Sequence, residues 1–174
     1  RDEVIKRARE AGIKMITVGT NWETSKEAVV MAEKYPEDIW ATVGFHPSHV
    51  TAENWYFDKN ELRKPIHENF HIDKFKEVAS HPKVVAIGEC GLDYYRINKI
   101  ADYELPSLDS LSRERGGRIK EDQKKAFIEQ IELARQLQKP LMIHCRPGKG
   151  TDDAYLDLIK IITDYELRIG KIIL

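Results

Sequence analysis

Three apolar segments of the chain each run into a polar residue that can bind a metal ion. These segments and residues are 84–88 with Glu89, 39–45 with His46, and 140–143 with His144. A carboxylate at the end of a buried strand is costly unless a cation or a strong hydrogen-bond donor compensates its charge. Imidazole is the commonest transition-metal ligand, and a carboxylate can bridge two cations. The pattern indicates a metal site where the three strands end.

Each of these residues also has a structural explanation. Backbone N–H groups or a neighbouring arginine could satisfy Glu89, and His144 could be a hydrogen-bonded core histidine. His46 lies in a Gly-Phe-His-Pro sequence, where it could bind a metal, contact a substrate, donate to a ligand or shape a turn. Small or apolar residues flank Glu89, which favours the functional explanation at this position.

Two further charged residues lie at the same strand ends. Arg146 is two positions after His144, so both side chains face one side of a strand, and the guanidinium could bind a phosphate through two hydrogen bonds. The alternative for Arg146 is an ion pair with Asp93 or Glu89. Asp93 could orient a metal ligand or cap the turn that follows it. We predict substrate-binding roles for His46, Asp93 and Arg146.

The two cysteines directly follow candidate metal ligands, since Cys90 follows Glu89 and Cys145 follows His144. Neighbouring side chains of a strand alternate between its faces, so Cys90 should point away from the side that carries Glu89. Reduced, buried thiols are therefore the favoured interpretation, and thiolate ligation of a metal is the alternative.

Apolar periodicity predicts strands that alternate with helices along the chain. The predicted strands cover 14–19, 39–45, 84–88, 140–145 and 171–174, and the predicted helices cover 3–11, 24–34, 73–79, 121–138 and 151–165. We expect Thr24 or Ser25 to cap the second helix. The polar stretch 97–120 is interpreted as an insertion or lid within a single domain, residues 1–174.

Continuous apolar strands separated by helices are typical of a parallel sheet covered by helices. A doubly wound sheet and a (β/α)8 barrel both fit this alternation. Candidate ligands at the ends of three different strands favour the barrel, because its strand ends converge at one mouth. A complete barrel takes about 250 residues, so this chain of 174 would supply roughly two thirds of one. It begins without methionine and ends inside an apolar segment, so we expect a fragment of a longer chain.

The composition, 41% hydrophobic and 33% charged, is that of an ordinary soluble domain. No apolar run approaches the roughly 20 residues that cross a bilayer, and no signal-peptide pattern opens the chain, so we predict no membrane association and a cytoplasmic location. A net charge of -1 gives no overall attraction to nucleic acid, so DNA binding would need a local basic patch. Neither a Gly-rich phosphate loop nor a Gly-x-Ser-x-Gly motif is present, which disfavours nucleotide-dependent and serine-nucleophile enzymes.

At these motifs the chain resembles the TatD family of metal-dependent hydrolases, in the amidohydrolase-like superfamily of TIM-like barrels. The matching pieces, in order, are Glu10-Ala11-Gly12 before Ile16-Thr17-Val18-Gly19-Thr20, Val43-Gly44-Phe45-His46-Pro47, Ile87-Gly88-Glu89-Cys90-Gly91-Leu92-Asp93-Tyr94, Gln123 with Phe127 and Gln130, and Pro140-Leu141-Met142-Ile143-His144-Cys145-Arg146. Each piece alone is weakly specific, but the ordered combination covers nearly the whole chain. The resemblance implies an incomplete α/β barrel containing strands 2–6 of eight.

The resemblance also implies a two-metal site. Glu89 would be the carboxylate shared by two divalent cations, and His144 would bind one of them. The family's His-x-His pair on the first strand, a His on the sixth and the general-base Asp on the eighth would lie outside these residues, with that Asp beyond residue 174. The ligand types suit Zn, Mn, Mg or Ni to different degrees.

The activity that the resemblance implies is metal-assisted hydrolysis of phosphodiesters in DNA, with the fragment itself inactive. The cations would lower the pKa of a bound water and stabilise charge on a phosphoryl oxygen. One alternative keeps the metal barrel but hydrolyses an ester or amide, as a deacylase does. A second alternative is a non-catalytic binding protein on the same frame. The sequence does not fix the oligomeric state.

Overall fold

The computed structural model describes residues 1–50, 69–95, 97, 109–165 and 172–173, in an α/β fold. The strands are β1 (Met15–Val18), β2 (Ile39–Val43), β3 (Val84–Asp93), β4 (Leu141–Arg146) and β5 (Ile172–Ile173), and they form one parallel sheet in the order β1-β2-β3-β4-β5. A doubly wound sheet reverses its strand order at a switch point. The described strands stay in sequential order, which is the order of a barrel wall.

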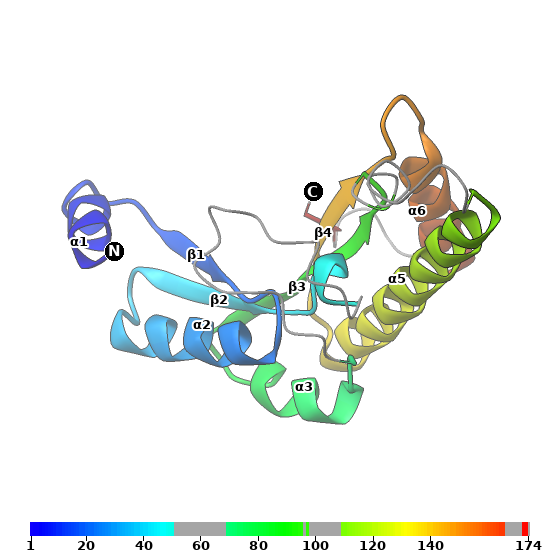
Figure 1. Cartoon of the computed structure of the whole chain (residues 1–174). Helices are drawn as coiled ribbons and strands as arrows, with labels where there is room; N and C mark the ends of the chain where they lie inside the picture. The colour runs from blue at the N-terminus through cyan, green and yellow to red at the C-terminus, as the bar shows by residue number, and fades with distance from the viewer. Residues whose placement is uncertain (51–68, 96, 98–108, 166–171, 174) are drawn as a thin grey trace.

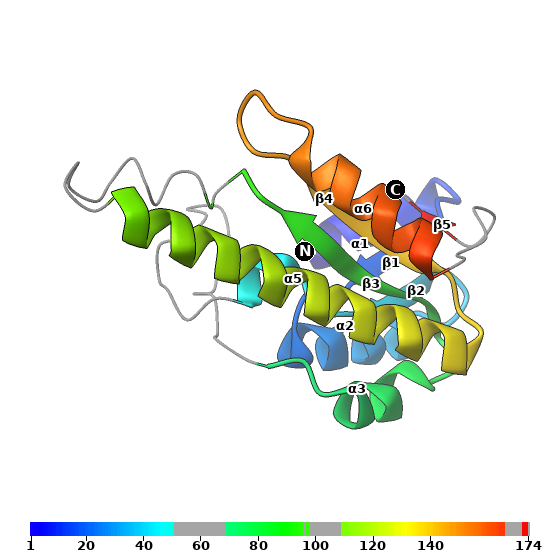
Figure 2. The same cartoon turned by 90° about the vertical axis from the view of Figure 1, so that its right-hand side faces the viewer.

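The sheet curls, and most of its helices cover the outer side of the curve. The helices are α1 (Asp2–Glu10), α2 (Trp22–Lys34), the 3-10 helix η1 (Pro47–His49), α3 (Ile72–Ala79), α5 (Asp109–Leu137) and α6 (Asp153–Asp164). Figure 1 shows α2 and α3 beneath β2, while Figure 2 shows α5 and α6 crossing over β3 and β4. On the opposite side of β1, Ile16 and Val18 are 46% and 38% exposed. Among the described residues, no helix combines the length and the apolar character needed to cross a membrane.

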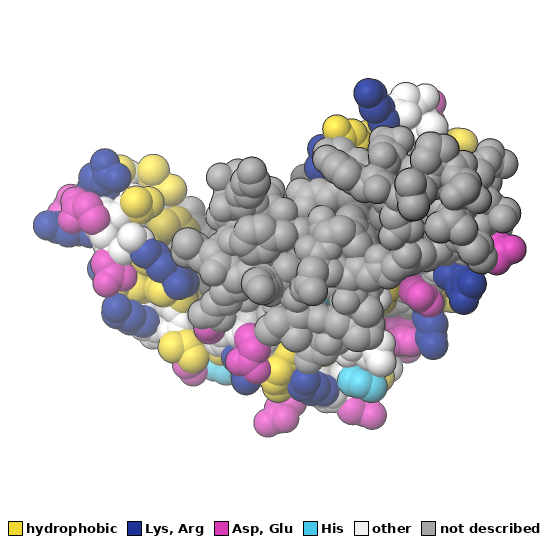
Figure 3. Space-filling view, in the orientation of Figure 1, with side chains coloured by type: hydrophobic (Ala, Val, Ile, Leu, Met, Phe, Trp, Pro, Cys, Tyr) yellow, Lys and Arg dark blue, Asp and Glu magenta, His cyan; other side chains and the backbone are white. Residues whose placement is uncertain are grey.

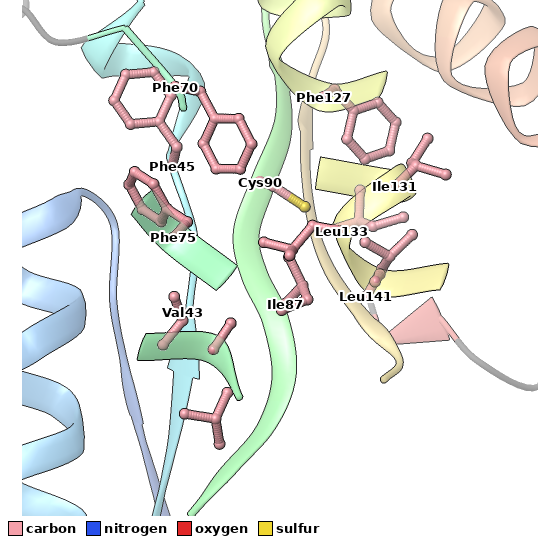
Figure 4. Close-up of a cluster of buried hydrophobic side chains, with 14 of the residues drawn as sticks. Val43, Phe45, Phe70, Phe75, Ile87, Cys90, Phe127, Ile131, Leu133 and Leu141 are labelled. Carbon is pink, nitrogen blue, oxygen red and sulfur yellow. The ribbon is translucent and has the colours of Figure 1, made fainter. Parts of the chain in front are cut away.

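The core lies between the sheet and these helices (Figure 4). Its largest buried side chains come from β2 and the residues just after it, β3, α3 and α5, and include Val43, Phe45, Phe75, Ile87, Phe127, Ile131 and Leu133. Cys90 is fully buried in the same cluster, so the prediction that it points away from Glu89 into the core is confirmed. Burial raises the pKa of the Cys90 thiol above its usual range, which keeps it protonated.

Strand β3 does not end at position 88, so the predicted boundary is wrong. The strand continues through Glu89 to Asp93. Its register with β4 shifts between Ile87 and Cys90, and pairing then resumes from Cys90–Ile143 to Asp93–Arg146. Gly88 and Gly91, which normally interrupt a strand, instead permit this irregular pairing. Glu89 therefore lies inside a paired strand rather than in the loop after it.

Helix α5 begins at Asp109, twelve residues before the predicted start at 121. Most residues between 113 and 120 have high helix propensity, and they outweigh Gly116 and Gly117. Ile119 is buried, so this first part of the helix packs on the core. Residues 109–120 are thus helical, and the role of 97–120 as an insertion or lid stays a prediction.

We expect Gly117→Ala to stabilise the protein. Gly117 lies in the interior of α5, and an added methyl group would meet nothing within 4 Å. Alanine there should raise the free energy of unfolding by about 0.5–1 kcal/mol. Urea unfolding of both forms measures the difference, and a destabilised variant would argue against a helix at this position.

Helix α2 is capped by Asn21, not by Thr24 or Ser25 as predicted. The Asn21 side chain accepts from the Thr24 backbone N–H at 2.9 Å, and the Thr24 hydroxyl accepts from the Asn21 N–H at 2.9 Å. This reciprocal pair is a capping box with Thr24 at its third helical position. Ser25 is fully buried and donates to the Gly44 carbonyl, joining α2 to the end of β2.

Asp153 anchors the loop after β4 and the first half of α5. It accepts hydrogen bonds from Lys120, Thr151 and the backbone N–H groups of Gly148 and Ala154. Burial alone would raise the pKa of Asp153, but these donors lower it to about 2.

This shift predicts a pH-dependent contribution to stability. The folded-state pKa lies below the unfolded one, so the contribution is complete above pH 3.8 and is lost as the pH falls through about 2. We expect Asp153→Asn to cost about 1 kcal/mol at pH 7, after allowing for solvent screening. The difference in free energy of unfolding between the unaltered protein and Asp153→Asn should become smaller below about pH 4. A gap that stays constant with pH would contradict this assignment.

Candidate metal centre

Three side chains from neighbouring strands meet at the carboxyl edge of the sheet. His46 follows β2, Glu89 lies in β3 and His144 lies in β4, and each offers one ligand atom within 4.8 Å of the others. The His144 Nδ1 lies 3.2 Å from the Glu89 Oε1, and the His46 and His144 rings are 4.4 Å apart. The expected convergence of the three strand ends is present.

The register shift in β3 determines where Glu89 lies. Its backbone N–H donates to the Gly19 carbonyl at 2.9 Å, just past β1, although β2 separates β1 and β3 over most of the sheet. Two residues on, Gly91 has φ +133°, and a Cβ there would collide with the backbone carbonyl of His144. Glycine is therefore required where β3 and β4 approach closely, beside both candidate ligands.

His144 lies between two carboxylates. Its Nδ1 faces Glu89, while its Nε2 lies 3.3 Å from the Asp93 Oδ2. Burial alone would lower the pKa of His144, but the contacts with Asp93 and Glu89 raise it to about 9. The same contact with His144 lowers the pKa of Glu89. In the metal-free protein this histidine supplies the positive charge that the carboxylates need.

Asp93 makes the contacts that both of its suggested roles would need. Its Oδ2 contacts the His144 ring, and its Oδ1 accepts from the Tyr95 backbone N–H at 3.2 Å, which caps the following turn. The side chain is only 1% exposed. This burial favours an orienting role toward His144 over the predicted contact with substrate.

His46 is buried, and η1 holds its ring. The backbone N–H of Ser48 donates to the His46 Nδ1 at 3.1 Å, so this nitrogen is an acceptor. Burial, followed by the nearby His144, lowers the pKa of His46 to about 3, so the ring is neutral. A neutral ring with an accepting Nδ1 carries its proton on Nε2. His46 is thereby suited to donate a hydrogen bond, whereas ligation through Nε2 would require the other tautomer.

Arg146 stacks on an aromatic ring at the same edge. Its guanidinium carbon lies 3.8 Å from the centre of the Tyr95 ring. The expected alternative, an ion pair with Asp93 or Glu89, is not formed among the described residues. The contribution of Tyr95 was not predicted, although a tyrosine two residues after Asp93 was a usable signal.

The donor set fits a divalent metal ion. A carboxylate and an imidazole that face each other, with a second imidazole beside them, are ligands that Zn and related cations accept. The contact between Asp93 and His144 supplies the carboxylate partner that metal-binding histidines commonly have. On the face shown in Figure 3, basic and acidic side chains are intermixed among the described residues, and they form no large patch of one charge sign.

Together, the fold and the donor set define a parallel α/β protein with a candidate divalent-metal centre at its strand ends. The chain belongs to the TatD-related DNase family, whose model matches residues 1–174. The resemblance stated from the sequence motifs is therefore confirmed.

Individual relatives agree with this assignment. The chain is 36% identical over 147 residues to the 3'-5' ssDNA/RNA exonuclease TatD of Erwinia tasmaniensis, covering 84% of this chain and 44% of that protein. It is 31% identical over 170 residues to the protein of the same name from Pectobacterium carotovorum, covering 97% and 50%. The chain thus spans about half the length of the curated relatives it matches.

A solved structure supports the fold. The crystal structure of YJJV, a TatD homologue from Escherichia coli K12, superposes with a TM-score of 0.54 at 22% identity, covering 92% of this chain and 50% of that one. At this identity the likeness concerns the fold alone, and it is consistent with the wall of a TIM-like barrel.

Proposed function

We propose that the whole protein is a divalent-metal-dependent phosphodiesterase acting on nucleic acid. The observation that carries this proposal is the meeting of His46, Glu89 and His144 within 4.8 Å at the carboxyl edge of a parallel sheet. Family membership and relatives named as 3'-5' ssDNA/RNA exonucleases support a phosphodiester as the bond cleaved. The sequential strand order and the exposed apolar side chains on the inner side of β1 support assigning β1–β5 to strands 2–6 of a (β/α)8 barrel.

In this proposal Glu89 and His144 would hold the metal, and the complete site would contain two divalent cations. Such cations supply Lewis-acid stabilisation of charge on phosphoryl oxygens. With a metal bound, Asp93 would accept the Nε2 proton of His144, and the Nδ1 lone pair would point toward the Glu89 side. The buried carboxylate thereby fixes both the tautomer and the orientation of the ligand.

Substrate contacts fall to His46 and Arg146. The Nε2 proton of His46 provides a neutral hydrogen-bond donor, held in place by Ser48. The Arg146 guanidinium, braced on Tyr95, provides a positive charge with a geometry suited to a phosphate. We propose single-stranded DNA or RNA as the substrate and the cytoplasm as the location.

A substrate comparison on one preparation tests this function. The whole protein, loaded with Mn²⁺ or Mg²⁺, is assayed on end-labelled single-stranded DNA and RNA, on duplex DNA, and on small ester and amide substrates. We expect shortening of single strands from the 3' end that stops when excess chelator is added. Cleavage of the esters or amides with intact oligonucleotides would instead indicate a deacylase, and inactivity on every substrate would favour a binding protein.

A further inference from the structure

Two buried glutamines of α5 lie seven residues apart, two turns along one face of the helix. Gln130 is fully buried and Gln123 is 3% exposed. Neither side chain carries a charge. Among the described residues, neither contacts a candidate metal ligand directly. A buried carboxamide is costly unless its donors and acceptor are all satisfied, so their partners explain why this apolar face contains them.

Each glutamine holds both backbone groups of one residue at a strand end. The Gln123 Oε1 accepts from the Asp93 N–H at 2.9 Å, and its Nε2 donates to the Asp93 carbonyl at 3.1 Å. The Gln130 Oε1 accepts from the Phe45 N–H at 2.7 Å, and its Nε2 donates to the Phe45 carbonyl at 3.0 Å. The side chains thus act as an additional strand partner where the sheet itself supplies none.

The backbone groups held in this way adjoin the candidate centre. Asp93 is the residue whose carboxylate contacts the His144 Nε2, and Phe45 immediately precedes His46. The Nε2 of Gln123 also lies 3.4 Å from the carbonyl of Pro47, the residue after His46. One helix on the outer side of the sheet therefore fixes the strand ends on either side of the site.

We propose that Gln123 and Gln130 are positioning residues for the metal centre. Gln123 holds the Asp93 backbone so that its carboxylate stays on the His144 ring, and Gln130 holds Phe45 so that the His46 ring stays in its place. The inference rests on the proposed function for its biological meaning. The effect of the glutamines on the two histidine rings can be measured without metal.

Ring signals of 15N-labelled histidines in the metal-free whole protein test this proposal. Gln123→Met keeps the length of the side chain but removes all its hydrogen bonds, and we expect it to change the ring nitrogen signals of His144. Gln130→Met should change those of His46. Gln123→Glu serves as a second variant if the methionine protein folds poorly, because it keeps the acceptor for the Asp93 N–H and loses both donated bonds.

Two controls separate positioning from general destabilisation. Gln136→Met removes a glutamine from the exposed side of the same helix, and Phe127→Leu weakens the core between the two buried glutamines. Neither control should alter the His144 or His46 ring signals. The proposal would be overturned if the histidine ring signals were unchanged in Gln123→Met and Gln130→Met. It would also be overturned if Phe127→Leu changed these signals equally.

Mn²⁺ titration of the same proteins separates this inference from the proposed function. We expect Gln123→Met to weaken Mn²⁺ binding about 10- to 100-fold, the usual effect of disturbing a ligand's orienting partner, with no change in Phe127→Leu. An affinity equal to that of the unaltered protein would count against positioning. If the unaltered protein binds no Mn²⁺ while the ring signals respond as expected, the positioning inference stands and the metal-dependent function fails.

Discussion

Glu89→Ala in the whole protein is expected to abolish nucleolytic activity. Glu89 faces the His144 Nδ1 at 3.2 Å and is the carboxylate of the group of candidate ligands. Metal assistance supplies several kcal/mol of transition-state stabilisation, and each 1.4 kcal/mol corresponds to about tenfold in rate. The kcat/KM should therefore fall about a thousandfold or more, and Mn²⁺ affinity should fall with it.

The matched control is Glu33→Ala. Glu33 is an exposed glutamate of α2 that pairs with His81, outside the group of candidate ligands. This variant should keep the activity and metal affinity of the unaltered protein. Retention of activity by Glu89→Ala, measured with metal in excess and with the fold verified by circular dichroism, would refute the assigned role of Glu89.

Gly91→Ala is expected to be the most destabilising single methyl addition near the site. Alanine at φ +133° is strained, and its Cβ would collide with the backbone of His144, which belongs to the neighbouring strand. The backbone of paired strands cannot move aside as a flexible side chain can. We expect a loss of about 3 kcal/mol or more in the free energy of unfolding, measured with urea.

Gly150→Ala is a control at a positive φ without a steric clash. Gly150 also has a positive φ, +73°, but an added methyl group there would meet nothing within 4 Å. Its substitution should cost only about 1 kcal/mol, the price of the strained backbone alone. An equal loss in the two variants would mean that the close approach of β3 to β4 is not what requires glycine at position 91.

The strand order and the converging site could be predicted because they follow from simple patterns. Each apolar strand ends near a polar residue that is costly to bury, and parallel strands place such ends at one edge of the sheet. Glu89, His46 and His144 are therefore recognisable without coordinates. The alternating faces of a strand likewise account for the correct prediction that Cys90 enters the core.

Features that depend on long-range contacts were not predicted correctly. The continuation of β3 past Gly88 depends on pairing with β4, more than 50 residues away. Local strand propensity does not predict this pairing. The early start of α5 depends on packing of Ile119 and on the ion pair between Lys120 and Asp153. In each case tertiary contacts outweighed a local signal.

The most direct test of the metal centre is anomalous diffraction from crystals of the whole protein grown with Zn²⁺ or Mn²⁺. We predict an anomalous peak within bonding distance of a Glu89 carboxylate oxygen and the His144 Nδ1, with Asp93 still in contact with the His144 Nε2. A metal-loaded crystal with no peak beside Glu89 and His144, or with peaks only elsewhere on the protein, would contradict it.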